Sequence, residues 1–432
     1  MSNIVNLLLP SLFLVNTVMA VLPGSGTQAQ PWRIENINHF NEFTADSNYW
    51  NGYVQLETDL ALGSYATAVI APDTDQATTG FQGTAFTGVF DGMGHCITTL
   101  KIDHNYPPLQ PDYDYLGFFG KIDTGALVKN LSIGKLPYDF GNVAIDISVF
   151  TGHSTECVGA LAGENKGAVL NCSAVARVLV GADASQIGGL IGNNLYGKVI
   201  QCHSFGMVQS DADSMYVGGL IGKNYASSAP VIFCYSGSEV KVRAGSQYAG
   251  GLIGANQWSQ VTKCFATGDV GPYFTTGGNY IGGLIGYNSN SSNVNNSYAL
   301  GTVKGNNYVG GLVGRHTYSG IRKCFATGTV TGASKVGGLV GDSDDGDPDV
   351  YDSFWDKDTS GTTTSDGGTT KSSQQMRQQE TFTNWDFNEF WQITQNQTYP
   401  NIRFYNQADI NHDGIVDIND FAIIAANWLE EN

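Results

Sequence analysis

Small and apolar residues recur along this chain with a period near 30 residues. A six-residue pattern occurs seven times: an aliphatic residue or Ala, two small residues, Leu, another aliphatic residue or Ala, and Gly. The copies begin at Val158, Ile187, Val217, Ala249, Ile281, Val309 and Val336, and YLGFFG at Tyr115 resembles a degenerate earlier copy. A fixed period of this length is typical of a solenoid.

A second apolar segment follows the first in each unit. These segments begin at Val169, Val199, Val231, Val261, Val294, Ile321 and Val350, and most are followed by a short stretch such as TGDV or TGTV. The pattern predicts a glycine-rich strand, a polar turn, a second strand and a third short strand in each unit. We therefore expect an all-β fold, a right-handed parallel β-helix whose rungs of about 30 residues stack roughly 4.8 Å apart.

Three repeat positions should form columns from turn to turn. The repeated Leu should line the interior, at Leu161, Leu190, Leu220, Leu252, Leu284, Leu312 and Leu339. Five of the seven Cys share one position, where Ser297 and Ser353 complete the series: Cys172, Cys202, Cys234, Cys264 and Cys324. We expect an inward ladder of small residues here, because stacked parallel strands rarely give disulfide geometry and a line of thiols is not a tetrahedral metal site.

A column of tyrosines precedes four of the glycine-rich segments, at Tyr216, Tyr248, Tyr280 and Tyr308. We expect these rings to stack on one another and to stabilise the rod. The alternative is a row of rings that stacks against sugars.

Composition supports an all-β protein and limits its partners. Gly accounts for 55 of 432 residues, and only 14% of residues are charged, against a typical share of about 25%. The formal net charge of −18 argues against nucleic acid as a partner, because a phosphate backbone is bound by clustered Lys and Arg. The same charge is compatible with a secreted protein that meets divalent cations.

The N-terminus predicts export. Residues 4–21 carry no charge, and Val18-Met19-Ala20 is a plausible cleavage site for a signal peptide spanning residues 1–20. A membrane anchor is the alternative, but Pro10 and Asn16 interrupt the apolar stretch. No other segment is long and apolar enough to span a bilayer, so we expect no stable membrane span after cleavage.

These motifs resemble the GLUG-motif family of extracellular bacterial β-helix proteins, over about Gly80 to Phe404. FTGVFDGMGHCITTLKI at 86–102 is similar to the usual opening of such proteins, and SFWDKDTSGTTTSDGG at 353–368 to the end of the repeat array. The resemblance implies a secreted or cell-surface protein in a family that includes adhesin-like proteins and some proteases. Those proteases carry the zinc-binding motif HExxH. None of the seven His here forms that motif, so the sequence does not support a zinc peptidase.

The C-terminal stretch DINHDGIVDIND predicts a Ca²⁺ site. Oxygen ligands fall at positions 1, 3, 5, 7, 9 and 12 of a calcium loop, with Gly414 at the turn: Asp409, Asn411, Asp413, Ile415 through its carbonyl, Asp417 and Asp420. A solvated acidic turn is the alternative reading of the same residues.

An amphipathic helix should follow this loop. Phe421, Ile424, Ala425 and Trp428 recur at helical spacing. Loop and helix at 408–430 resemble one half of a type I dockerin, which implies a cohesin-like or other surface partner. A helix this short is marginal alone in water, so it should pack on the rod, on another copy or on a partner.

Two other groups of residues suggest chemistry. The segment 342–358 holds eight Asp, and it could be a solvated loop, a second cation site or a carboxylate active site. Asp91 and His95 could form an acid–base pair, but their place in the FDGMGH opening favours a structural turn. We assign no catalytic residues.

The sequence divides into a signal peptide (1–20), an N-terminal cap with the first rungs (31–125), the GLUG-repeat β-helix (126–358), a C-terminal cap and surface excursion (359–405) and the calcium module (408–430). It favours a secreted or cell-surface non-enzymatic protein that serves adhesion or binds a carbohydrate matrix, attached or assembled through its calcium module. The alternative is an extracellular polysaccharide lyase or glycoside hydrolase on a β-helix frame.

Overall fold

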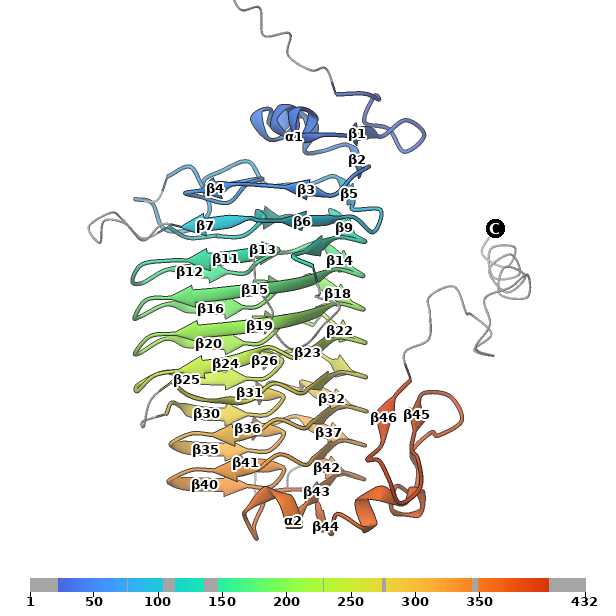
Figure 1. The fold of residues 1–432 in the computed structure, drawn as a ribbon. Coiled ribbons are helices and arrows are strands. Elements are labelled where there is room, and N and C mark those ends of the chain that lie inside the picture. The colour runs from blue at the N-terminus through green and yellow to red at the C-terminus, as the bar shows by residue number, and fades with distance from the viewer. Residues whose placement is uncertain are drawn as a thin grey trace, which may run out of the picture.

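The chain folds into a parallel β-helix, as the repeats predict (Figure 1). The computed structural model describes residues 22–75, 77–103, 113–135, 147–227, 229–273, 277–343 and 349–403. Four long parallel sheets run along the rod, and we name them A to D. They contain 11, 18, 8 and 7 strands respectively.

The strands are distributed among the sheets as follows. Sheet A contains β1 (Trp32–Ile34), β2 (Tyr53–Leu56), β5 (Val89–Asp91), β9 (Leu127–Lys129), β14 (Ala168–Leu170), β18 (Lys198–Ile200), β22 (Val231–Ile232), β27 (Val261–Thr262), β32 (Asn293–Asn295), β37 (Gly320–Arg322) and β42 (Asp349–Tyr351). Sheet B contains β3 (Leu60–Ala61), β4 (Ser64–Tyr65), β6 (Cys96–Thr98), β7 (Lys101–Asp103), β10 (Ser132–Ile133), β11 (Ile147–Phe150), β15 (Ser173–Val180), β19 (His203–Ser210), β23 (Tyr235–Ser236), β24 (Glu239–Val242), β28 (Phe265–Ala266), β29 (Val270–Pro272), β33 (Tyr298–Ala299), β34 (Val303–Lys304), β38 (Phe325–Ala326), β39 (Val330–Thr331), β43 (Phe354–Asp356) and β44 (Thr369–Lys371). Sheet C contains β8 (Phe119–Ile122), β13 (Ala162–Asn165), β17 (Ile191–Leu195), β21 (Ile221–Tyr225), β26 (Ile253–Gln257), β31 (Ile285–Ser289), β36 (Val313–Thr317) and β41 (Val340–Ser343). Sheet D contains β12 (Glu156–Val158), β16 (Ser185–Gly188), β20 (Met215–Gly218), β25 (Gln247–Gly250), β30 (Asn279–Gly282), β35 (Asn307–Gly310) and β40 (Ser334–Gly337).

Each turn visits the four sheets in the order D, C, A and B. One turn runs through β16, β17, β18 and β19 before β20 begins the next. The glycine-rich segment was expected to form one strand, but it forms two, because Gly189 and Leu190 turn the chain between β16 and β17. The turn therefore has four sides rather than the three that the pattern predicted.

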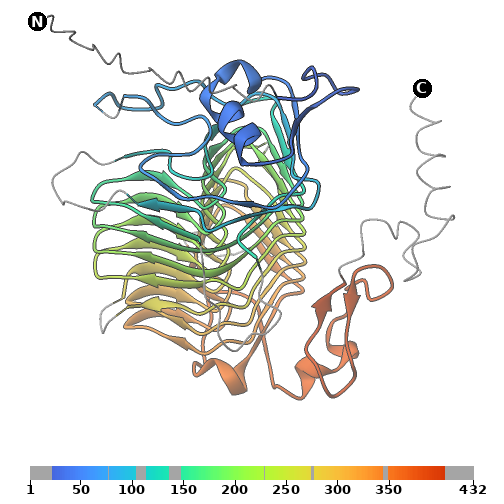
Figure 2. The ribbon, with the colours of Figure 1, turned by 45° about the horizontal axis from the view of Figure 1, so that its top comes forward.

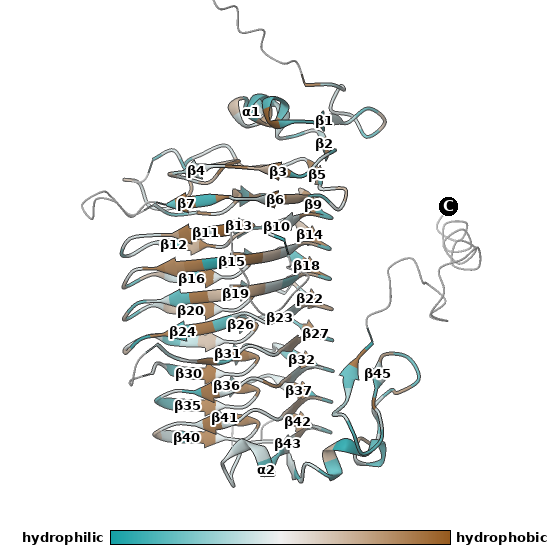
Figure 3. Ribbon diagram, viewed as in Figure 1, coloured by the Kyte–Doolittle hydropathy of each residue, from teal (hydrophilic) through white to brown (hydrophobic). Residues whose placement is uncertain are grey.

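Equivalent repeat positions pair in register, so residues of similar hydropathy recur from turn to turn along the rod (Figure 3). The predicted Leu column is fully buried: Leu161, Leu190, Leu220, Leu252, Leu284, Leu312 and Leu339 are all 0% exposed. Burial of each such side chain contributes about 2 kcal/mol relative to an exposed one. The column is therefore a main element of the core.

The Cys column also lies inside the rod, as expected. All seven cysteines are buried and free of disulfides. The backbone N–H groups of Cys172, Cys202 and Cys234 each donate to the sulfur of the cysteine one turn further on, at 3.4 Å. The hydroxyl of Ser297 takes the place of the sulfur for Cys264, at 3.1 Å. The column thus links turns through weak hydrogen bonds.

The glycines of the repeat allow a backbone approach that no side chain permits. A Cβ at the first glycine position would lie 1.7–2.6 Å from a carbonyl oxygen three residues ahead. One at the second position would lie 2.1 Å from the glycine carbonyl of the next turn in the five copies from Ile187 to Val309, while the first copy has Ala160 there. At the third position, for example Gly254, a Cβ would lie within 2.4–2.6 Å of the backbone of the preceding turn. Sheets C and D pack this closely because these positions, apart from Ala160, lack a Cβ.

Both ends of the rod are covered. At the N-terminal end, α1 (Ile37–Ala45) packs Phe40 against Phe118 and Phe43 against Phe90, with ring centroids 5.9 and 6.0 Å apart. Asn36 caps this helix by accepting from the N–H groups of Asn38 and His39. A short 3₁₀ turn, η1 (Ser47–Tyr49), follows.

At the C-terminal end, one segment covers the last turn and the next packs beside it. Residues 364–371 form backbone hydrogen bonds with the exposed strand edges of the last turn. The Gly338 N–H donates to the Thr364 carbonyl, and β44 pairs with β43. The following segment, residues 372–403, lies beside the last turns of the rod (Figure 2) and packs on Tyr298, Phe325 and Phe354 of sheet B. We call residues 372–403 the C-terminal cap. The sequence predicts a cap within 359–405, but these residues pack on the side of the rod rather than over its last turn.

The remaining elements belong to this end. They are α2 (Lys357–Ser360), η2 (Gln375–Arg377), η3 (Gln379–Thr381), and the antiparallel pair β45 (Trp391–Gln392) and β46 (Asn401–Ile402). Asp356 caps α2 by accepting from the Asp358 N–H. No helix in the described ranges is both long and apolar enough to cross a bilayer.

The glycine requirement predicts a large loss of stability in Gly250→Ala. Its Cβ would lie 2.1 Å from the Ile253 carbonyl oxygen, so the backbone must shift and the free energy of unfolding should fall by about 3 kcal/mol. Chemical denaturation measures the change. The matched control is Gly63→Ala, where a Cβ would meet nothing within 4 Å; equal losses in the two variants would contradict the explanation.

Candidate functional site

The predicted calcium ligands lie outside the described residues. These are Asp409, Asn411, Asp413, Ile415, Asp417 and Asp420, and the site therefore stays a prediction. Within the described ranges, no group of three or more His, Cys, Asp or Glu side chains is placed to hold a metal ion.

The described part of the Asp-rich segment makes structural bonds. Asp342 pairs with Arg315 at 3.9 Å and with Lys335. The carboxylate of Asp356, which is fully buried, accepts from the hydroxyls of Ser373 at 2.6 Å and Tyr399 at 2.7 Å. These carboxylates hold the last turn and the C-terminal cap in place; residues 344–348 lie outside the described residues.

Asp91 and His95 are not partners of each other. The Nδ1 atom of His95 lies 3.1 Å from the Asp59 carboxylate, which also accepts from the Cys96 N–H at 3.0 Å. Asp91 instead forms an ion pair with Lys129, with 3.0 Å between Nζ and Oδ2. The two residues serve separate structural contacts, as the FDGMGH turn predicts.

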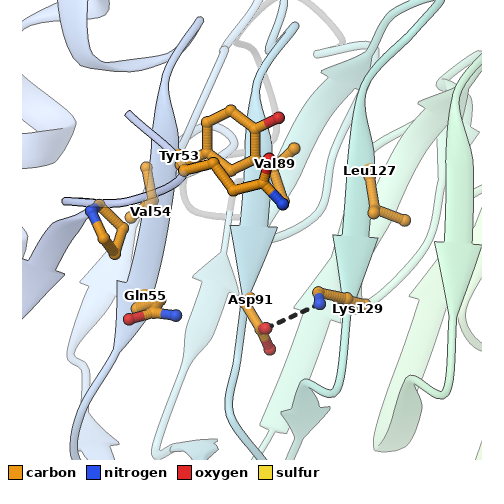
Figure 4. A pocket seen from close by; sticks show the side chains of 9 residues that line it. Tyr53, Val54, Gln55, Val89, Asp91, Leu127 and Lys129 are labelled. Atoms are coloured by element: carbon orange, nitrogen blue, oxygen red, sulfur yellow. Dashed lines mark ion pairs between the residues drawn. The ribbon is translucent and has the colours of Figure 1, made fainter. Parts of the chain in front are cut away.

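The Asp91–Lys129 pair lies in a pocket on the outer face of sheet A (Figure 4). The pocket has a volume of about 410 Å³, and its floor comes from three neighbouring strands, β2, β5 and β9. Outward-facing residues of these strands line it together with Gln28 and Pro31 of the preceding loop: Tyr53, Gln55, Val89, Asp91, Leu127 and Lys129. In-register stacking places these side chains side by side.

A second pocket of about 490 Å³ adjoins the first. It shares Pro31 and Gln55 and adds Gln30 and Arg33. We call the two together the sheet A trough. Its polar groups are amides, the Asp91–Lys129 ion pair and the guanidinium of Arg33, which pairs with Glu35 at 3.3 Å. Among its apolar surfaces is the ring of Tyr53, which is 36% exposed.

Asp91 stays ionised in the trough. Burial raises the pKa of its carboxyl, but hydrogen bonds from the Met93 N–H, Asn130 and Lys129 outweigh burial, so the pKa lies below its usual value. An ionised carboxylate and an ammonium side by side offer an acceptor and a donor to a ligand that carries hydroxyl groups.

The predicted tyrosine column is a self-stacked ladder. Ring centroids of Tyr216, Tyr248, Tyr280 and Tyr308 are 5.2, 4.9 and 4.5 Å apart in turn, with interplanar angles of 8–20°. The rings cover one another's faces, so the column presents edges and hydroxyls to solvent. Its residues all have φ near +60°, a left-handed conformation that bends the sheet D strand at this position.

Cations flank this ladder. The Lys223 ammonium lies 5.0 Å from the ring centroid of Tyr216, and the Arg315 guanidinium 5.6 and 5.3 Å from those of Tyr280 and Tyr308. Burial lowers the pKa of Lys223. These contacts tie sheet C to sheet D and add cation–π attraction to the ring stacking.

The sequence interpretation missed a buried asparagine ladder. The Nδ2 group of each asparagine donates to the Oδ1 atom one turn further on, at 2.6–2.8 Å, along Asn165, Asn194, Asn224, Asn256 and Asn288. At the last turn of the ladder, Nδ2 of Asn288 lies 3.3 Å from Nδ1 of His316. Nε2 of His316 is hydrogen-bonded to the Ser319 carbonyl at 2.8 Å. The signal was present in the sequence, because an Asn stands two residues after the last glycine of five copies.

A second aromatic column on the outer face of sheet B was also missed. His203, Tyr235, Phe265, Tyr298 and Phe325 stack with centroids 4.7–4.9 Å apart and interplanar angles of 2–12°. Each of these residues directly follows the Cys/Ser column in the sequence, so the repeat alignment contained the signal.

Comparison with known proteins agrees with the repeat assignment. The family model described as the GLUG motif matches residues 245–271, 277–304 and 305–331, three consecutive turns, which confirms the predicted motif there. The dockerin-like resemblance of 408–430 stays a prediction.

The chain is similar in sequence to one curated protein and in structure to a solved one. Halomucin from Haloquadratum walsbyi is 28% identical over 181 residues, which are 40% of this chain and 2% of halomucin. A crystal structure of a candidate immunoglobulin A1 protease from Bacteroides ovatus aligns over 89% of this chain and 95% of that chain, with 18% identity and a TM-score of 0.43. At that TM-score the structural similarity supports no conclusion about activity.

The asparagine ladder predicts a large effect of Asn256→Ala. The change leaves the Asn224 amide, the Asn288 oxygen and the Ser259 carbonyl without their partner inside the rod. The free energy of unfolding should fall by about 3 kcal/mol, as measured by chemical denaturation. In the control Gln257→Ala, on the same strand and half-buried, the loss should stay under about 0.5 kcal/mol; similar losses in both would refute the role of the ladder.

Proposed function

We propose that this protein is an extracellular or cell-surface β-helix protein that binds carbohydrate in the sheet A trough. On this proposal it is attached or assembled through a calcium-binding module at residues 408–430. The β-helix fold, the GLUG repeats and the similarity to halomucin fit an extracellular surface protein.

The observation that carries the binding proposal is the lining of the trough. Sugar hydroxyls both donate and accept hydrogen bonds, and Gln28, Gln55 and the Asp91–Lys129 pair supply both functions. Tyr53 offers an exposed ring beside them, so a sugar would meet an apolar surface as well as polar groups. A few polar groups placed around an apolar surface are characteristic of ligand sites.

The same geometry favours binding over cleavage. A glycoside hydrolase of the usual kind needs two carboxyl groups, one on each side of the scissile bond, about 5–9.5 Å apart. Asp91 is the one carboxylate among the residues that line the trough, and it is ion-paired with Lys129. The polysaccharide lyase or hydrolase is therefore the second candidate.

Trough variants test the binding proposal. Tyr53→Ala and Gln55→Ala should each weaken binding to a polysaccharide retained by the wild-type protein by roughly tenfold, the effect of losing about 1.4 kcal/mol of contacts. Affinity electrophoresis against a panel of neutral and acidic polysaccharides measures this. The control is Tyr351→Ala, an exposed ring on β42 at the other end of sheet A.

Three results would count against the proposal. They are no retention by any polysaccharide, an equal loss in Tyr351→Ala, and unchanged binding in both trough variants. Release of new sugar ends during incubation would favour the enzymatic candidate instead.

The calcium module makes a separate prediction. Isothermal titration of the full chain should show about one Ca²⁺ site, and Asp409→Ala should remove it, because the first loop position contributes a carboxylate oxygen. Glu57→Ala, an exposed acid near the N-terminal end, should leave the titration unchanged. Unaltered calcium binding in Asp409→Ala would refute the loop assignment.

A further inference from the structure

The aromatic column on sheet B is covered along only part of its length. The C-terminal cap buries Tyr298, Phe325 and Phe354, whose exposed fractions are 5%, 0% and 7%. One turn away the same column continues as Phe265, Tyr235 and His203, which are half-buried. We call these last three residues the open ladder. It is the same stack of rings without the cap.

Apolar residues continue across the border between the covered and open parts. The Lys263 ammonium lies between two rings there, 4.6 Å from the centroid of Phe233 and 4.3 Å from that of Phe390 in the cap. Phe233, Phe265 and Phe390 are partly buried and pack against the cap cluster. The apolar surface under the cap thus extends past its edge onto the open ladder.

The described chain ends at this border. Ile402 of β46 and Tyr298 belong to the same buried apolar cluster. Tyr298 is the register partner of Phe265, the first ring of the open ladder. The guanidinium of Arg403 is held by the carbonyls of Phe387 and Asn388. Residues 404–432 therefore continue from a point one turn away from the open ladder.

The composition of residues 404–432 is complementary to the open ladder and to Lys263 beside it. Phe421, Ile424, Ala425 and Trp428 are spaced to form one apolar helix face. The segment 404–432 holds six Asp and Glu and neither Lys nor Arg, which complements Lys263 at the border. Residues 404–408, which precede the predicted calcium loop, span up to about 17 Å when extended, and neighbouring turns lie only about 4.8 Å apart, so the linker is long enough for docking.

We propose that residues 421–428 dock on the open ladder of their own chain, with Phe421, Ile424 and Trp428 against Phe265, Tyr235 and His203. This contact would extend the C-terminal cap up the face of sheet B. A helix of about ten residues is marginal alone in water, and the ladder would supply the apolar burial it needs. A surface partner that uses the same helix face would first have to displace it.

Photo-crosslinking of the full chain tests the docking. The probe p-benzoylphenylalanine is placed at Phe265 in one protein and at Tyr235 in a second, so that failure of one variant to fold leaves the other. The control carries the probe at Tyr280, in the ladder at the junction of sheets C and D. Mixing isotope-labelled and unlabelled protein distinguishes crosslinks within one chain from those between two.

We expect probes at 265 and 235 to crosslink to peptides containing 421–428 within one chain, and the probe at 280 not to. Ile424→Asp should lower the yield by on the order of tenfold, because it places a charge in the apolar contact. Crosslinks between chains would assign the open ladder to a second copy and overturn the proposal. It is also overturned if folded probe variants give no crosslink to 421–428, or if Ile424→Asp leaves the yield unchanged. None of these crosslinking results tests carbohydrate binding in the trough, which lies on sheet A.

Discussion

The rod depends on how closely its backbones approach at the junction of sheets C and D. In the five copies from Ile187 to Val309, three glycine positions face carbonyl or amide groups at distances that exclude a Cβ. This approach sets the register of every turn, because the adjacent Leu, Val and Ile side chains reach the interior only when sheets C and D close on each other. Glycine costs conformational entropy in a strand, and here that cost is offset by burial of the apolar columns that the close approach permits.

Register then converts a repeated sequence into continuous ladders. The asparagine amides form an unbroken chain of buried hydrogen bonds, the cysteine sulfurs accept from backbone N–H groups of neighbouring turns, and two columns of rings stack on the outside. Each ladder is made of chemically similar residues from one repeat position. Every turn added in register therefore extends the ladder and stabilises the rod further. A turn at either end lacks a neighbour on one side, and the Phe cluster under α1 and the segment 364–371 cover these ends.

The fold could be predicted from sequence because the residues that determine it recur with a nearly fixed period. The spacing of the VGGLIG copies indicated the solenoid, and the repeated Leu and Cys positions indicated the interior. The four-sided turn could not be predicted, because Gly189 and Leu190 are compatible with a continuous strand until the facing backbone is known. The asparagine ladder was missed because an isolated Asn before a loop is usually read as a turn residue. The trough depends on contacts between the loop at Gln28 and Pro31 and strands β2, β5 and β9, which no local pattern encodes.

Deleting one whole turn tests the central claim, that register between equivalent positions holds the rod together. Removal of residues 249–280 joins Tyr248 to Ile281, the register partner of Ala249, so every column should close again. The account predicts a cooperatively unfolding protein with unchanged circular dichroism per residue and a rod shorter by about 4.8 Å. Deletion of 249–264, which places Phe265 where Ala249 stood, should prevent folding. A full-turn deletion that unfolds as completely as the half-turn deletion would contradict the account.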